Sequence, residues 1–195
     1  MPRRRFALAA VFVLAILPHI QFIVSAGGFV QGLANDEQHD LISIRSSPFE
    51  TALETLQVQI GYKYKKIGLL RRAMTHASFS EENNKALSIL GANVIETSVS
   101  MRSLESNLEI SAKELNRRIS DVSKVESSCA ADGKRLGLHK VVRVSPKTDS
   151  SAPLVVCGAF RAVFGAIALD TEKADDAGEC FWRVHGGQVG GALAM

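Results

Sequence analysis

Apolar side chains recur every three or four positions through most of the segment 47–185, the spacing that gives an α-helix one buried face. Ser47-Pro48 predicts a helix start, because serine can cap free backbone N–H groups and proline fits the first turn. Gly61 predicts the end of that helix, and residues 67–74 suggest a short second one. Alternating strand patterns are scarce in the middle of the chain, so the pattern predicts an all-α fold.

Two further helix starts are indicated by serine followed by acidic residues. SEEN (80–83) predicts the start of a third helix, since acids in a first turn complement the helix dipole. Ser111 predicts the cap of a fourth helix, with Glu114 as its capping-box partner. The rest is expected to comprise a basic, glycine-containing loop and two helices, at 128–150, 152–169 and 174–184.

The N-terminus has the pattern of a secretory signal. A basic start at residues 3–5 precedes the apolar run FALAAVFVLAIL (6–17), and Val24 and Ala26 suit a cut after Ala26. We therefore expect the secretory pathway, as an endoplasmic reticulum lumen or secreted protein with no stable membrane span after cleavage; an uncleaved anchor and a mitochondrial transit peptide are the alternatives. The expected organisation is a signal peptide, a linker, a helical domain and a flexible tail, at 1–26, 27–46, 47–185 and 186–195.

The net charge of +3 comes from the N-terminus, because removing Arg3, Arg4 and Arg5 from 23 basic residues leaves 20 against 20 acidic ones. Bulk charge therefore gives no support for nucleic-acid binding. Two local basic patches are candidates for RNA phosphates, although a solvated surface is the favoured interpretation. The first contains Lys63, Lys65, Lys66, Arg71 and Arg72. The second contains Lys134, Arg135, Lys140, Arg143 and Lys147.

The three cysteines, Cys129, Cys157 and Cys180, match no zinc or CxxC spacing. The favoured interpretation is that all three are small buried apolar residues. The alternative, in an oxidising lumen, is one disulfide and one remaining thiol.

Four blocks in order resemble the ribonuclease III family: RRAMTHASFS (71–80), NKALSILGANVI (84–95), DGKRLGLHK (132–140) and GAFRAVFGAIALD (158–170). The second is similar to the family's signature N-E-R-L-E-F-L-G-D-x-V-L, and the fourth to D-x-F-E-A-x-x-G-A-I-x-L-D. The resemblance implies an all-α ribonuclease III-like domain that forms a homodimer through the signature helix. It also implies metal-assisted cleavage of double-stranded RNA, if the metal ligands are present.

All five metal-binding carboxylates of that family pattern are replaced in this chain, whereas its terminal acid is kept as Asp170. The first signature acid falls on Lys85, the i, i+4 pair on Ser88 and Ala92, and the i, i+3 pair on Gly158 and Arg161. Magnesium requires several oxygen ligands, which these side chains do not supply. We therefore expect no catalytic residue, no metal ligand and no cofactor. Magnesium would enter only through a rebuilt site, for which the candidates are Glu81, Glu82 and Glu96.

The function expected is that of a non-enzymatic scaffold or interaction module with an unknown protein partner. A double-stranded-RNA-binding pseudo-nuclease and an endoribonuclease with a rebuilt metal site are the alternatives. Resemblance to a small plant member of the family, over NNKALSILG and VESSCAADGKRLGL (125–138), implies a role in karyogamy in the female gametophyte. His76 is expected to be structural, and Asp170 to cap or turn the chain.

Overall fold

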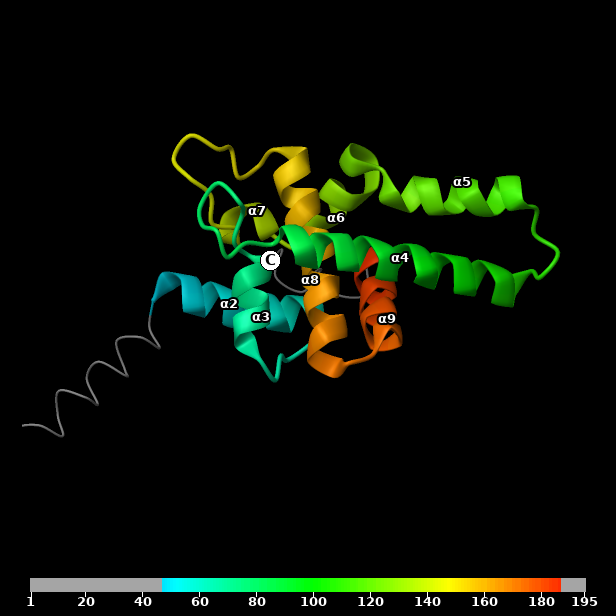
Figure 1. Ribbon diagram of the computed structural model, residues 1–195, viewed down its shortest axis with the longest axis horizontal. Coiled ribbons are helices and arrows are strands. Elements are labelled where there is room, and N and C mark those ends of the chain that lie inside the picture. Colours follow the sequence, from blue (N-terminus) through cyan, green and yellow to red (C-terminus); the bar gives the residue numbers. More distant parts are fainter. Residues whose placement is uncertain (1–46, 187–195) are drawn as a thin grey trace, which may run out of the picture. The chain divides into compact units, whose positions relative to one another are not determined.

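The structure is a computed structural model that describes residues 47–186. The predicted signal peptide, the linker and residues 187–195 of the tail lie outside the described residues. Within 47–186 there are helices and no β-strand, which confirms the all-α prediction (Figure 1). The elements are α2 (Pro48–Ile60), α3 (Ile67–Ala73), α4 (Lys85–Ser106), α5 (Ala112–Ser123), the π-helical turn η1 (Val125–Cys129), α6 (Ala130–Arg135), α7 (Leu138–Val141), α8 (Pro153–Thr171) and α9 (Ala174–His185).

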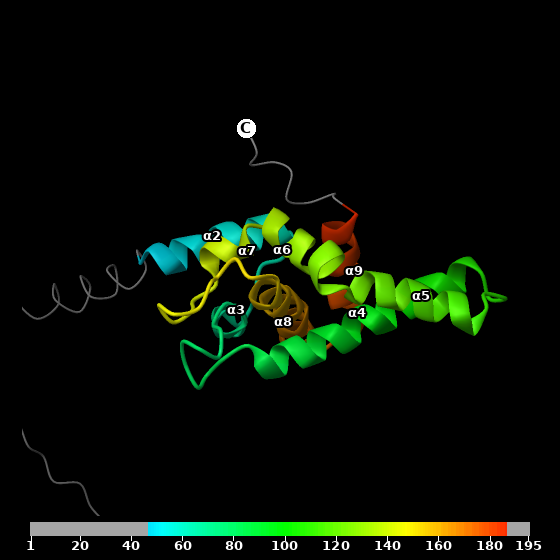
Figure 2. The same cartoon turned by 90° about the horizontal axis from the view of Figure 1, so that it is seen from above.

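Helix α8 forms the centre of the core. It contacts α3, α4, α6, α7, α9 and η1, and Figure 2 shows it enclosed by its neighbours. Phe160 and Phe164 pack edge to face with each other and with Phe181 of α9. The length and mean hydropathy of α8 (1.7) would also suit a membrane span, but 67% of its apolar window is buried inside the protein, as expected of a core helix.

Two glycines allow α4 and α8 to cross with their backbones in contact. A Cβ atom on Gly91 would overlap the carbonyl oxygen of Arg161, and one on Gly165 would overlap the carbonyl oxygen of Leu87. Both glycines are buried. Any side chain at either position would push the helices apart, so the crossing depends on these residues.

The predicted helix ends at Ser47, Gly61 and Ser111 are confirmed. Each of the Ser47 and Ser111 hydroxyls accepts a hydrogen bond from the backbone N–H of the residue three positions later, at 3.2 Å. Gly61 ends α2 in the left-handed region, with φ 70°. The capping box at Ser111 is only half formed, because the Glu114 carboxylate binds Arg117 and Arg118. The hydrogen bonds from Arg117 and then Arg118 lower the pKa of Glu114 to about 2.

Three predictions for the middle of the chain are wrong. Helix α4 begins at Lys85 instead of Ser80. Asn83 binds the carbonyl oxygens of the loop residues 80 and 81, and the side chain of Asn84 donates to the carbonyl oxygen of Ala73. The segment 128–150 contains α6, α7 and part of η1 instead of a continuous loop. Cys129 and Cys157 form a disulfide, so the favoured interpretation of three buried thiols is also wrong. The bridge joins η1 to α8, and the third cysteine is a buried thiol.

Asp170 fixes the chain before α3. Its buried carboxylate accepts hydrogen bonds from the Tyr62 hydroxyl at 2.7 Å and from the backbone N–H groups of Lys65 and Lys66 at 2.8 Å each. Burial opposes ionisation of Asp170, but these three hydrogen bonds outweigh it and lower the pKa of the carboxyl group. Asp170 therefore turns the chain into α3, the role expected from the sequence.

Candidate functional site

The positions that carry acids in the family lie around the crossing of α4 and α8. Ser88 and Ala92 each follow a residue of α4 that faces α8, namely Leu87 and Gly91. Gly158 and Arg161 lie on α8, one turn apart. A Cβ atom on Gly158 would meet no atom within 4 Å, so the missing carboxylate there leaves open space. Helices α4 and α8 pack together here, and none of the five positions carries a carboxylate.

Arg161 is fixed by a hydrogen bond. Its guanidinium donates to the carbonyl oxygen of Ser123, at the end of α5, at 2.9 Å. The Ser123 hydroxyl in turn donates to the Glu96 carboxylate on α4 at 3.1 Å. Arg161 and Glu96 therefore both bind Ser123, and a fixed cation occupies one family carboxylate position.

The residues present do not fit a divalent cation. Among residues 47–186, no three His, Cys, Asp or Glu side chains gather closely enough to hold a metal ion. Glu81 and Glu82 are exposed in the loop before α4, and Glu96 is bound to Ser123. A hard dication needs several oxygen ligands at one point, and the three candidates for a rebuilt site do not supply them.

In the first basic patch, the lysines form no salt bridge within the described residues, whereas both arginines bind other residues of the chain. Lys63, Lys65 and Lys66 are exposed before α3, and none forms a salt bridge within the described residues. Arg71 pairs with Glu50 at 3.0 Å, and Arg72 donates to the carbonyl oxygen of residue 83. The three lysines and the exposed Arg72 are therefore the part of this patch that can reach a phosphate.

The second basic patch is not one surface, because its two arginines have internal partners. Arg135 donates to Asp132 at 2.6 Å and to the Val184 carbonyl oxygen at 2.5 Å. Arg143 lies over the rings of Phe49 and Phe79, at 4.3 and 4.8 Å from their centroids. Burial, and then the charge of Arg71, lower the pKa of Arg143. The lysines of this patch are exposed: Lys134, Lys140 and Lys147.

Two histidines, His76 and His185, form polar contacts. His76 binds Ser78 through its ring nitrogen Nδ1, at 2.9 Å to the hydroxyl and 3.1 Å to the backbone N–H, which is a local structural contact. His185 binds the buried Asp132 at 2.6 Å and so joins the end of α9 to α6. The Asp132–His185 pair was not foreseen, because no local motif connects residues 53 positions apart.

Comparison with known proteins identifies the class. The family model described as Ribonuclease-III-like matches residues 66–181, so the chain belongs to the ribonuclease-III-like family. It is 59% identical over 150 residues to Protein NUCLEAR FUSION DEFECTIVE 2 of Arabidopsis thaliana, covering 77% of this chain and 78% of that protein. It is also 31% identical over 133 residues to Ribonuclease 3 of Delftia acidovorans. That match covers 60% of this chain but only 53% of the relative.

The fold comparison agrees with this assignment. The nuclease domain of ribonuclease III from Campylobacter jejuni superposes with a TM-score of 0.64 at 24% sequence identity, covering 68% of this chain and 94% of that domain. That solved structure is described in terms of a region involved in dimer formation. The likeness establishes the helical nuclease-domain fold.

Proposed function

We propose that this chain is a catalytically inactive ribonuclease-III-like protein that acts as an interaction module. The observation that carries the proposal is the replacement of all five family carboxylates, at Lys85, Ser88, Ala92, Gly158 and Arg161. A guanidinium held by Ser123 beside the α4–α8 crossing opposes a dication by charge repulsion. The relative from Arabidopsis thaliana is named for a defect in nuclear fusion, and we extend a role in karyogamy to this protein on that basis.

A cleavage assay on purified protein tests the loss of activity. Duplex RNA incubated with the protein and magnesium is expected to stay intact. Magnesium-dependent cutting would contradict the proposal, and a Glu81→Gln, Glu82→Gln, Glu96→Gln variant then shows whether those carboxylates rebuild the site. Cutting that needs the metal but survives all three substitutions would refute the ligand argument itself.

We also propose that the protein is a homodimer that pairs through α4 and α8. Each of these helices exposes a large apolar side chain, Ile89 at 67% and Leu154 at 75%, and exposed apolar residues mark association surfaces. Sedimentation is expected to give a dimer mass that falls to the monomer mass in Ile89→Lys. Val58→Lys is the matched control, because Val58 on α2 is also a large exposed apolar residue, at 75%. A wild-type monomer at micromolar concentration would contradict the pairing.

The compartment we propose is the secretory pathway, with mitochondria as the alternative. Besides the N-terminal pattern, the Cys129–Cys157 disulfide supports an oxidising lumen, since disulfides persist there and are rare in the cytosol. The location of a C-terminally tagged protein tests this, together with its processed N-terminal residue. A start at Gly27 in the secretory pathway is expected, and a mitochondrial signal would contradict it.

Duplex-RNA binding without cleavage is the second candidate function, favoured by the exposed lysines 63, 65 and 66. If it holds, the logarithm of the binding constant falls linearly with the logarithm of salt concentration, because phosphate contacts release counterions. Absence of binding at low salt would exclude it.

A further inference from the structure

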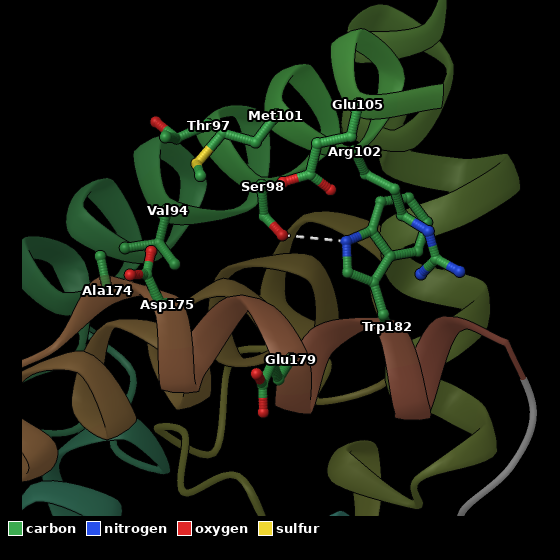
Figure 3. A pocket seen from close by; sticks show the side chains of 10 residues that line it. All are labelled: Val94, Thr97, Ser98, Met101, Arg102, Glu105, Ala174, Asp175, Glu179 and Trp182. Atoms are coloured by element: carbon green, nitrogen blue, oxygen red, sulfur yellow. Dashed lines mark hydrogen bonds between the residues drawn. The ribbon is translucent and has the colours of Figure 1, made fainter. Parts of the chain in front are cut away.

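Helices α4 and α9 line a groove of about 480 Å³ (Figure 3). Residues of both helices line it, including Val94, Met101, Arg102, Glu105, Glu179 and Trp182. We call it the α4–α9 groove. Neither the RNA-cleaving pattern of the family nor the predicted basic patches use these residues.

The base of the groove is built by tight packing. The Trp182 indole N–H donates to the Ser98 hydroxyl at 2.9 Å (Figure 3). Gly178 lies against the same serine, since a Cβ atom there would come within 2.7 Å of its oxygen. The Arg102 guanidinium lies 4.5 Å from the centroid of the Trp182 ring. The groove is therefore present before any partner binds.

An exposed apolar stripe continues from the groove along α4. Met101, Leu104 and Leu108 follow each other at spacings of three and four, with exposed fractions of 48%, 37% and 77%. Met101 and Leu104 share one side of α4, and Leu108 lies in the turn after the helix, past Asn107, whose backbone is extended. Several exposed apolar side chains in one row indicate contact with another molecule.

The charges of the groove are mainly negative. Glu105, Asp175 and Glu179 lie against one cation, Arg102, and none of these four residues forms a salt bridge within the described residues. The helix dipole explains Asp175, which is in the first turn of α9. It does not explain Glu105, which is in the last turn of α4, where the dipole disfavours an acid. The unpaired carboxylates therefore favour a partner that carries positive charge.

We propose that the α4–α9 groove and the stripe beside it bind a basic amphipathic helix of a partner protein. A lysine or arginine of that helix enters the groove between the carboxylates, and its apolar face covers Met101, Leu104 and Leu108. Apolar side chains three or four positions apart on the partner helix form one face that can cover such side chains. The negative groove repels phosphates, so this face does not bind RNA. The inference names a partner for the interaction role proposed above and rests on it.

The only tryptophan of the chain, Trp182, gives a direct probe of the groove. A synthetic helical peptide with leucines at i, i+3 and i+7, flanked by lysines, is titrated against the whole protein while Trp182 emission is recorded. Saturable binding is expected, weaker at high salt. The same peptide with glutamates in place of the lysines is expected not to bind.

Glu105→Lys with Glu179→Lys is expected to raise the Kd for the basic peptide at least about tenfold. Glu54→Lys with Glu82→Lys is the matched control, since it makes the same charge change at exposed positions elsewhere. Circular dichroism verifies that both variants are folded. The RNA-cleavage assay does not depend on peptide binding. If the peptide fails to bind, the groove proposal fails, and the proposed loss of nuclease activity is still tested by the cleavage assay.

Three outcomes would overturn the proposal. The first is equal binding of the glutamate peptide, or equal loss of binding in the control variant. The second is no saturable emission change with the basic peptide up to about 1 mM. The third is displacement of the peptide by duplex RNA or by raised protein concentration, which would assign the groove to RNA or to a second copy of the chain.

Discussion

Helix α4 of this ribonuclease-III-like chain has two surfaces. One keeps the residues of the family signature, and the other does not. The surface toward α8 keeps the buried residues of the signature, such as Leu87 and Gly91. The neighbouring positions, Ser88 and Ala92, carry no carboxylate. Packing and metal binding use different side chains of one helix, so one can be lost while the other is retained. The same division holds on α8, between Gly165 and the positions 158 and 161.

The largest effect is expected at the packed surface. Gly165→Ala would force a methyl group into the Leu87 carbonyl, and since backbone cannot move aside cheaply, we expect a loss of about 4 kcal/mol in unfolding free energy. Gly158→Ala, on the same helix but facing open space, is expected to gain about 0.5–1 kcal/mol. Urea unfolding measures both, and similar losses in the two variants would break the comparison.

The disulfide is expected to be next in size. It closes a segment with a sequence separation of 28 residues, so reducing it should lower the unfolding free energy by about 3 kcal/mol. A Cys129→Ala, Cys157→Ala variant should be destabilised from the start and insensitive to reductant. If the wild-type protein unfolds identically with and without dithiothreitol, the bridge does not hold η1 to α8.

A smaller effect is expected at Asp170, outside both surfaces. Asp170→Asn should cost about 2 kcal/mol at neutral pH, because the buried carboxylate accepts three hydrogen bonds. The folded pKa is lowered, so the advantage of the wild-type protein is present above the unfolded pKa of about 3.9 and is lost as the pH falls through the folded value. Unfolding at stepwise pH checks this, and an advantage that grows in acid would contradict the sign.

The smallest effect is expected at a lost acid position. Arg161→Met removes one hydrogen bond to the Ser123 carbonyl and keeps the aliphatic length of the side chain, so a loss of about 1 kcal/mol is expected. Thermal unfolding of Arg161→Met and of Gly165→Ala, measured together, compares the loss of stability at the two surfaces. A loss as large as that of the glycine variant would mean that Arg161 belongs to the packing.

The helices were predictable where a local rule sets their ends. Ser47, Gly61 and Ser111 act within three residues of themselves, so the sequence contains the whole cause. The start of α4 was misplaced because the acids after Ser80 resemble a first turn, whereas the side chain of Asn84 binds the distant Ala73 carbonyl. That contact exists only after folding.

Some features of the candidate site were also predictable from the sequence, and others were not. The loss of carboxylates could be seen in the sequence, because ligand chemistry depends on residue type. The hydrogen bonds of Arg135 to the Val184 carbonyl and of Arg143 to the Thr75 hydroxyl could not be seen, because these partners are 49 and 68 positions away. The pairing of Cys129 with Cys157 likewise depends on how η1 meets α8.

Calorimetric titration with magnesium tests the central claim most directly: that the fold is retained and the metal site is lost. The wild-type protein is expected to show no saturable heat of binding. A variant restoring the family acids is expected to bind the ion, since Gly158 faces open space: Lys85→Glu, Ser88→Glu, Ala92→Asp, Gly158→Asp and Arg161→Glu. Stoichiometric magnesium binding by the wild-type protein would contradict the account.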